Sequence, residues 1–285
     1  NKLISHWPGE EGIAVIQSET LQTGGPGLNM AVNLARLGIG SPIAGVAAIG
    51  DDPYGHLIHD RCAAHSIATD LAPLLRGART SYTDVLTNSS NGKRTFFHSP
   101  GANDLLTPDH FDLDFSKVRL LHLGAPGIHT IMDQTWDTEP NGWVTVLNKA
   151  RAAGAATNME MVSLPPEQTR SLVLPCLPYL DTLIINDTEA GALAGIDTTP
   201  SGKTDHRLVA RAAEWIKGQG VHKLAAIHFP MGCVAATDDG IIFHPSVNIP
   251  QQLVKSSTGA GDAFASGLMF GLLEAWELEE SIKLA

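Results

Sequence analysis

Short apolar runs alternate with helical periods along much of the chain. The run DTLIIN precedes the helix-like stretch DTEAGALAG, and HKLAAIHF follows the amphipathic stretch HRLVARAAEWIKGQG. Strands that alternate with helices in this way are typical of βαβ units. RLLHLGAP indicates a further buried strand upstream, which a loop connects to the helix GWVTVLNKARAAG. The pattern therefore predicts an α/β domain built around a mostly parallel sheet.

One region interrupts this rhythm. The stretch TSYTDVLTNSSNGKRTFFHS holds two β-rich runs around an Asn-Gly turn, which is the usual signal of a hairpin. Together with residues 10–24, residues 80–100 are expected to form a small β lid over the sheet edge where ligands bind in α/β folds. Residues 1–285 are otherwise expected to form a single domain.

Composition limits the classes of partner. The 285 residues include 19 Lys and Arg against 30 Asp and Glu, a formal net charge of -11. Nucleic acid is therefore not an expected partner, because clustered basic residues normally bind its phosphates. No apolar run is long enough to cross a bilayer, so no membrane partner is expected. Cys62, Cys176 and Cys233 are odd in number and far apart, which favours a cytoplasmic location over a disulfide framework or a zinc site.

A glycine turn precedes a predicted helix in GGPGLNMAVNLARLG. Gly24 and Gly25 let a ligand approach the backbone closely. A purely structural alternative makes the glycines a plain turn and Asn29 a helix N-cap. The spacing differs from the Gly-x-Gly-x-x-Gly fingerprint, so it does not favour a dinucleotide-binding oxidoreductase.

The stretch NDTEAG places Asn186 at the end of an apolar strand and Glu189 three residues later. Both side chains then lie at the carboxyl edge of the sheet. The same spacing is that of a capping box, in which the two side chains bind free backbone N–H groups of a helix start. Taken alone, the stretch is explained better by local capping than by ligand binding.

The stretch STGAGDAFASG predicts an anion site with a carboxylate beside it. The turn Gly259, Ala260 and Gly261 can direct several N–H groups at one point, and the following helix adds its positive dipole end. Asp262 in the first helical turn would repel a bound phosphate unless it has a chemical role. The role that fits is proton acceptance from an alcohol that attacks the terminal phosphate of a nucleotide, while the turn stabilises the transferred group.

These motifs resemble those of the ribokinase-like (PfkB) family of carbohydrate kinases, in the family's order and over nearly the whole chain. GGPGLNMAVNLARLG resembles the family's first signature, IGDDPYG its usual sequel, GKRTFFHSPGAN the segment leading out of the lid, NDTEAG its Asn-x-x-Glu motif, and STGAGDAFASG its second signature. Several motifs in the right order are far more specific than any one of them.

The resemblance implies a three-layer αβα fold with a β lid, ATP as phosphate donor and Mg²⁺ as the bridging ion. It implies that Asp262 is the catalytic base and that the turn of residues 259–261 is the anion hole. Asn186 and Glu189 would act on Mg²⁺ and the phosphates, largely through water. Gly24, Gly25 and Asn29 would contact the substrate hydroxyls.

The chain departs from the family pattern at several places. Ser256 and Ser257 stand where the second signature usually starts with Asp-Thr, which weakens the expectation of a monovalent cation such as potassium. IHFPMG replaces a nucleotide-contacting pattern. Gly232 at the end of that stretch and Ser256 before the second signature are the expected nucleotide-binding residues. An early strand and the final helices of the family's domain are expected to lie beyond Asn1 and Ala285, outside this chain.

The sequence thus predicts an ATP-dependent kinase that phosphorylates a primary hydroxyl of a sugar or sugar acid. Two alternatives stay open: a nucleoside kinase of the same fold, and a non-catalytic regulator that binds a sugar or nucleotide. Retention of Asp262 argues against the regulator. Because the lid would have exposed strand edges, a homodimer through the lid is also expected.

Overall fold

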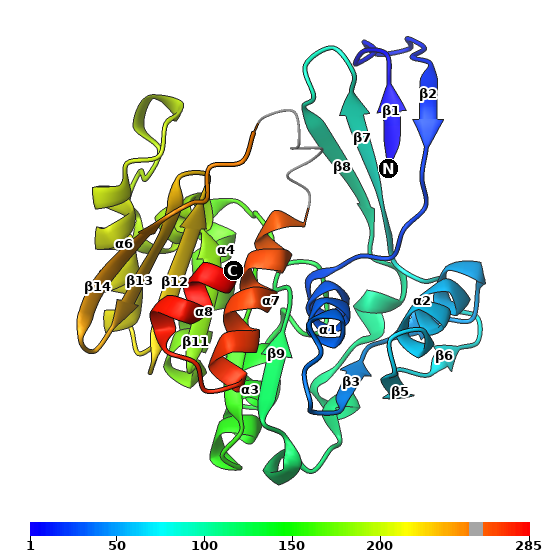
Figure 1. The fold of residues 1–285 in the computed structure, drawn as a ribbon. Coiled ribbons are helices and arrows are strands. Elements are labelled where there is room, and N and C mark those ends of the chain that lie inside the picture. Colours follow the sequence, from blue (N-terminus) through cyan, green and yellow to red (C-terminus); the bar gives the residue numbers. More distant parts are fainter. Residues whose placement is uncertain (251–258) are drawn as a thin grey trace.

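The computed structural model describes residues 1–250 and 259–285, and a central sheet organises them (Figure 1). Its strands are, in spatial order, β14 (Gly240–Pro245), β13 (Gly232–Thr237), β12 (Leu224–Phe229), β11 (Thr182–Asn186), β10 (Ala156–Met159) and β9 (Leu120–Leu123). Strands β9 to β12 run parallel, and β13 and β14 are antiparallel additions. The predicted mostly parallel sheet is confirmed.

Helices cover both faces of this sheet. Residues of β12 alternate between two apolar clusters: Ala225 and Ile227 pack into one, and Leu224 and Ala226 into the other. The first cluster holds helices α3 (Gly142–Ala152), α4 (Pro166–Val173), α5 (Asp187–Ala194) and α6 (His206–Gly218). The second holds α1 (Pro26–Leu37), α7 (Ala260–Leu273) and α8 (Leu278–Leu284). This is the expected three-layer arrangement, because successive strand residues face opposite sides.

A second sheet projects beyond the main body (Figure 1). This small sheet has the order β2 (Ile16–Glu19), β1 (Lys2–Ile4), β7 (Tyr82–Asn88) and β8 (Arg94–Ser99). Strands β7 and β8 form the hairpin around the Asn-Gly turn. Strand β1 lies outside the predicted segments 10–24 and 80–100, yet it joins β2 to β7. The prediction missed it because a three-residue strand carries no readable alternation.

Short elements connect the two sheets. They are β3 (Ile43–Val46), β4 (Ile49–Gly50), α2 (Pro53–Ala63), β5 (Ile67–Leu71), β6 (Leu74–Leu75) and the 3₁₀ turns η1 (Gly101–Leu105), η2 (Pro108–Phe111) and η3 (Phe115–Lys117). Two further 3₁₀ turns, η4 (Leu174–Tyr179) and η5 (Pro200–Gly202), lie between elements of the main body. Asp52 caps α2 by accepting from the N–H of Gly55 at 2.9 Å. It also accepts from the N–H of Thr80 at 2.8 Å, two residues before β7. The carboxylate of Asp52 thus links the start of α2 to the segment that leads into β7 of the small sheet.

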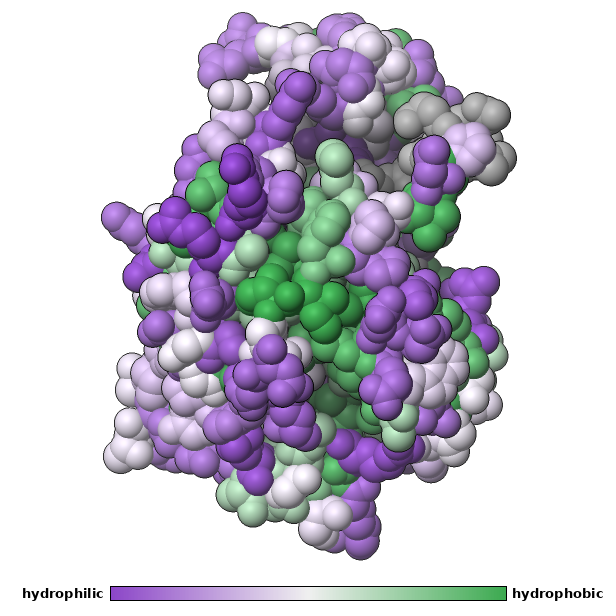
Figure 2. All heavy atoms as spheres, turned by 60° about the vertical axis from the view of Figure 1, so that its left-hand side comes forward, coloured by the Kyte–Doolittle hydropathy of each residue, from purple (hydrophilic) through white to green (hydrophobic). Residues whose placement is uncertain are grey.

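The open edge of the main sheet is apolar. Strand β14 forms this edge and leaves Ile241 42% and Phe243 47% exposed. Figure 2 shows apolar side chains gathered in the middle of the face on that side of the molecule. None of the described helices is long and apolar enough to span a membrane.

Candidate active site

Polar side chains interrupt the apolar strands at one edge of the main sheet. His228 and Asn186 are register partners near the carboxyl ends of β12 and β11. His122 lies on β9, and Glu160 directly follows β10. By strand alternation all four share the face covered by α1 and α7, because Leu224, Ala226 and Ile184 pack with those helices. The fold therefore gathers titratable groups beneath the start of α7.

Asp262 lies in the first turn of α7, directly above this edge. The helix starts after Gly259, whose φ of 77° is left-handed. Asn29 of α1 donates a hydrogen bond from Nδ2 to Oδ2 of Asp262. Burial raises the pKa of Asp262, the charge of Glu160 raises it further, and the hydrogen bond from Asn29 and the nearby His122 lower it. Asp262 is thus a held and desolvated carboxylate, as a positioned base requires.

Asn29 is not the helix cap that the structural alternative required. Helix α1 begins at Pro26 with Gly25 as its N-cap, so Asn29 lies within the helix. Gly25 has a φ of 95°, which explains a glycine there, and both Gly24 and Gly25 are exposed. The structure brings Asn29 to Asp262, while Gly24 and Gly25 form an open turn beside it.

The predicted anion turn packs against the sheet edge. Gly259 and Ala260 are exposed. The first N–H groups of a helix have no partner within it, so they are available to an anion. A Cβ added to Gly261 would lie 3.2 Å from Cε1 of His228, so the turn sits closely on that ring. Because His228 pairs with Asn186 across the sheet, the turn and the NDTEAG motif meet at one place.

The NDTEAG stretch forms the capping box that the local alternative predicted. Asn186 Oδ1 accepts from the N–H of Glu189 at 2.9 Å, and Glu189 Oε2 accepts from the N–H of Asn186 at 3.1 Å. Glu189 is nevertheless unlike an ordinary cap, because it is only 8% exposed. Burial raises its pKa to about 7, and the charge of Glu160 contributes. The cap and a role in ligand binding are compatible.

These residues fit Mg²⁺ only as a partly hydrated ion. Among the described residues, no three or more His, Cys, Asp or Glu side chains cluster closely enough to hold a metal. Mg²⁺ commonly keeps several waters and binds one or two carboxylates together with substrate phosphates. Glu189 and Asn186 can supply carboxylate and amide oxygens in that way.

Of the two expected nucleotide-binding residues, the structure describes only Gly232. Gly232 opens β13, where an added Cβ would lie 2.3 Å from the backbone oxygen of His244 and 2.9 Å from the ring of Phe243. Packing in the strand hairpin therefore explains this glycine without a nucleotide. Ser256 lies outside the described residues.

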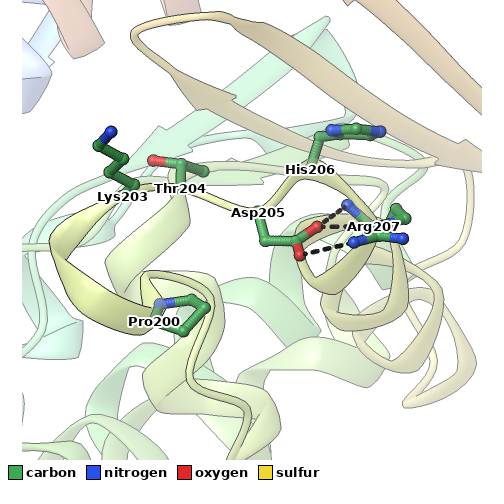
Figure 3. A pocket seen from close by; sticks show the side chains of 6 residues that line it. All are labelled: Pro200, Lys203, Thr204, Asp205, His206 and Arg207. Carbon is green, nitrogen blue, oxygen red and sulfur yellow. Dashed lines mark hydrogen bonds and ion pairs between the residues drawn. The ribbon is translucent and has the colours of Figure 1, made fainter.

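Two surface hollows lie apart from Asp262. The larger, of about 590 Å³, precedes α6, and Figure 3 shows Asp205 and Arg207 in it paired with each other. Thr204 in its wall donates to Asp187, next to Asn186. A smaller hollow of about 370 Å³ between α4 and α5 reaches Glu189. Neither hollow contains Asp262.

Sequence reasoning missed three residues of the site: His122, Glu160 and His228. Each interrupts or directly follows an apolar strand, in LLHL, TNME and AIHF. A titratable residue at an inward position of a buried strand is the signal that could have found them. Glu160 is 6% exposed, which no surface role would require.

Comparisons with known proteins identify the family and the fold. Residues 3–285 match the pfkB family of carbohydrate kinases. The chain is 26% identical to a probable fructokinase-2 of Arabidopsis thaliana, over 99% of this chain and 83% of that protein. Ribokinase of Arabidopsis thaliana, solved with ribose and ATP, is similar with a TM-score of 0.76 at 19% identity, over 99% of this chain and 86% of that one.

The fold is shared with nucleoside kinases too. Adenosine kinase of Sinorhizobium meliloti matches with a TM-score of 0.75 at 22% identity, over 99% of this chain and 82% of that one. The family match covers nearly the whole chain and includes each of the motifs around Asp262. This chain belongs to the pfkB family of carbohydrate kinases and is, as its motifs predict, an ATP-dependent phosphotransferase.

Proposed function

We propose that this kinase phosphorylates a primary hydroxyl of a sugar or sugar acid, with Asp262 as general base. The observation that carries the proposal is the position of Asp262, which Asn29 holds at the start of α7 beside an exposed glycine turn. A carboxylate next to an anion site is unfavourable unless it accepts a proton during the reaction.

In the proposed reaction, the acceptor hydroxyl oxygen forms a bond to the γ-phosphorus as the bond to the ADP oxygen breaks. The hydroxyl proton passes to a carboxylate oxygen of Asp262. The N–H groups of residues 259–261 stabilise the charge on the transferred group. Mg²⁺, held through Glu189 and Asn186, would neutralise phosphate charge there.

The acceptor is proposed to lie between the Gly24–Gly25 turn and Asp262. Asn29 would then contact both the catalytic carboxylate and a substrate hydroxyl. A sugar is favoured over a nucleoside because the exposed turn GGPGLN has no aromatic residue on which a base could stack. The fructokinase relatives support a ketose as the first acceptor to test.

ADP release with Mg-ATP tests this proposal across ketoses, aldoses, sugar acids and nucleosides. Acceptor-dependent release with a sugar would support it. Release with adenosine or a related nucleoside alone would replace it with the nucleoside kinase alternative. Omission of each acceptor controls for simple ATP hydrolysis.

Glu189→Gln is expected to raise the Mg²⁺ concentration required for half-maximal turnover by about tenfold, because a neutral amide binds Mg²⁺ less well than a carboxylate. Gln also serves at the third position of a capping box, so helix α5 should stay capped.

The same variant should change the pH dependence of stability. Burial raises the pKa of Glu189 to about 7, so its ionisation lowers the stability of the wild type as pH rises from the ordinary pKa of 4.5 through 7. The variant should therefore melt at a higher temperature than wild type at pH 8. A lower melting temperature with an unchanged Mg²⁺ requirement would leave Glu189 only its capping role.

We also propose a homodimer that forms through the small sheet. Its outer strands β2 and β8 expose Ile16 50%, Phe96 58% and Phe97 51%, which is unusual for an isolated sheet. Light scattering after size exclusion should give twice the chain mass. Phe96→Ser together with Phe97→Ser should return the mass to that of one chain, whereas a monomeric wild type would exclude this pairing.

A further inference from the structure

Glu160 and His122 are buried side chains that take no part in the reaction proposed above. Their side chains are 7% and 9% exposed, and His122 Nε2 lies 3.6 Å from Glu160 Oε2. Within the described residues, both carboxylate oxygens of Glu160 and Nε2 of His122 lack a hydrogen-bond partner. A buried carboxylate without hydrogen bonds destabilises a fold. Such a group is typical of a functional site.

A chain of hydrogen bonds orients the pair. Thr182 Oγ1 donates to Asn158 Oδ1 at 2.9 Å, which leaves Nδ2 of Asn158 to donate to Nδ1 of His122 at 2.8 Å. The other ring nitrogen, Nε2, lies 3.6 Å from Glu160 Oε2. The chain of hydrogen bonds therefore fixes the orientation of the His122 ring beside the carboxylate.

The position of Glu160 links it to the catalytic carboxylate. Its N–H donates to the oxygen of Leu123 at 2.9 Å, at the carboxyl edge of β9. A Cβ on the neighbouring Gly124 would lie 2.9 Å from Cβ of Pro26 and 3.9 Å from Cβ of Glu160. Glu160 therefore lies beneath the first turn of α1, the helix whose Asn29 holds Asp262. Because the carboxylate oxygens of Glu160 are enclosed, Glu160 affects the neighbouring titratable groups through its negative charge.

Several titratable groups surround Glu160. They are His122 of β9, Asp262 of α7, Glu189 of α5 and His228 of β12. The negative charge of Glu160 raises the pKa of Asp262, after burial, and also raises that of Glu189. Burial lowers the pKa of His228, and Glu160 opposes that effect. Glu160 is thus the common charged neighbour of the site.

We propose that Glu160 is a positioning residue of this active site: its enclosed carboxylate, which lies beside His122 and beneath the first turn of α1, acts through space on Asp262. The inference rests on the proposed role of Asp262. The proton still passes from the acceptor hydroxyl to Asp262 while the bond to ADP breaks. Glu160 exchanges no proton and contacts no substrate.

Glu160→Gln tests this role because it removes the charge and keeps the shape. The acid limb of the pH profile of kcat/KM should move down by about one pH unit, since a like charge nearby raises a carboxyl pKa by about that amount. Turnover at neutral pH should fall about threefold as Asp262 becomes a weaker base. The KM for the acceptor should stay unchanged, because the oxygens of Glu160 do not reach it. A higher KM with an unmoved acid limb would make Glu160 a substrate contact and overturn the proposal.

His122→Gln provides a second variant with the opposite sign. His122 lowers the pKa of Asp262, so its loss should move the acid limb up rather than down. Asp181→Asn is the matched control, because Asp181 is also buried but pairs with Arg151 and Lys223 at the opposite edge of the same strands. This control should leave the profile in place. Equal profiles in all three variants would overturn the proposal.

A direct titration separates this inference from the proposed reaction. The ¹³C-carboxyl NMR signal of Asp262, identified by its absence in Asp262→Asn, reports the pKa of that group without any substrate. Its pKa should fall in Glu160→Gln and rise in His122→Gln, even if no acceptor gives turnover. An unshifted signal in Glu160→Gln would refute the coupling, whereas a shifted signal in an inactive protein would refute only the proposed reaction.

Discussion

Asp262→Asn is expected to lose 99% or more of its turnover, a fall of about 10²–10⁴-fold in kcat. The amide has the shape of the carboxylate and can still accept the hydrogen bond from Asn29. It cannot take the proton of the acceptor hydroxyl. Binding of ATP, measured by calorimetry, should change by less than about threefold, because the N–H groups of the glycine turn are untouched. Wild-type turnover in this variant would remove the catalytic base from the mechanism.

The same substitution should stabilise the fold. Burial and Glu160 raise the pKa of Asp262 from the ordinary value of 3.8, so the folded protein holds its proton more tightly than the unfolded chain. Stability is then lost as pH rises from that ordinary value through the raised one. Asp262→Asn should melt at a higher temperature than wild type at pH 8, and the difference should vanish near pH 3. A gain in stability with a loss of turnover distinguishes a catalytic carboxylate from a structural one.

Asp181→Asn provides the matched control for that comparison. Asp181 is a buried carboxylate, whereas Asp262 is partly buried, and it accepts from the N–H of Thr157 at 3.0 Å and pairs with Arg151 and Lys223. Its removal should lower the melting temperature and leave kcat within about twofold of wild type. Asp262→Asn should therefore gain stability and lose turnover, whereas Asp181→Asn should lose stability and keep its turnover.

Local patterns predicted the elements that local forces form. The alternation of apolar runs and helical periods predicted the parallel strands β9, β11 and β12, because each contains a run of apolar residues. It did not predict β10, whose four residues include the polar Thr157 and Asn158. The capping box of Asn186 and Glu189 was also readable, since its two hydrogen bonds join residues three positions apart. Family motifs added Asp262 and its glycine turn, which the periodicity alone would have treated as an ordinary helix start.

Contacts between residues far apart in the sequence could not be predicted from local patterns. Asn29 and Asp262 are 233 positions apart, so no local pattern could join them, and the stretch alone favoured a helix cap as the role of Asn29. Strand β1 has only three residues and pairs with both β2 and β7, so tertiary contacts define it. His122 and Glu160 resemble single polar interruptions of apolar strands, and only the sheet register brings them beneath Asp262.

The stretch IGDDPYG was found by family resemblance, but the sequence did not predict its structural role. In the structure it is a tightly packed junction between α2 and the small sheet. Asp52 accepts from Gly55 and Thr80, and hydrogen bonds to three donor groups keep its pKa below the ordinary value despite its burial penalty. A Cβ on Gly50 would lie 2.4 Å from the backbone nitrogen of Thr80. The motif therefore holds the small sheet against the main body.

Gly55→Ala should consequently destabilise the protein by about 3 kcal/mol or more and lower its melting temperature by about 10 °C. The added Cβ would lie 2.0 Å from the backbone oxygen of Gly50 and 3.0 Å from the side chains of Ile49 and Leu74. The backbone oxygen of Gly50 cannot move aside as a flexible side chain can. Helix α2 must therefore shift and lose the hydrogen bond from Gly55 to its N-cap residue, Asp52. Differential scanning calorimetry measures the loss.

Gly40→Ala is the control for this variant, because no atom lies within 4 Å of its added Cβ and its φ is ordinary. It should melt within about 1 °C of wild type, with any change toward higher stability. If the junction also orients the small sheet over the substrate, Gly55→Ala should raise the KM for the acceptor more than it lowers kcat at a temperature where it remains folded. Wild-type melting of Gly55→Ala would show that the junction relaxes around a methyl group, and the small sheet would then owe its position to other contacts.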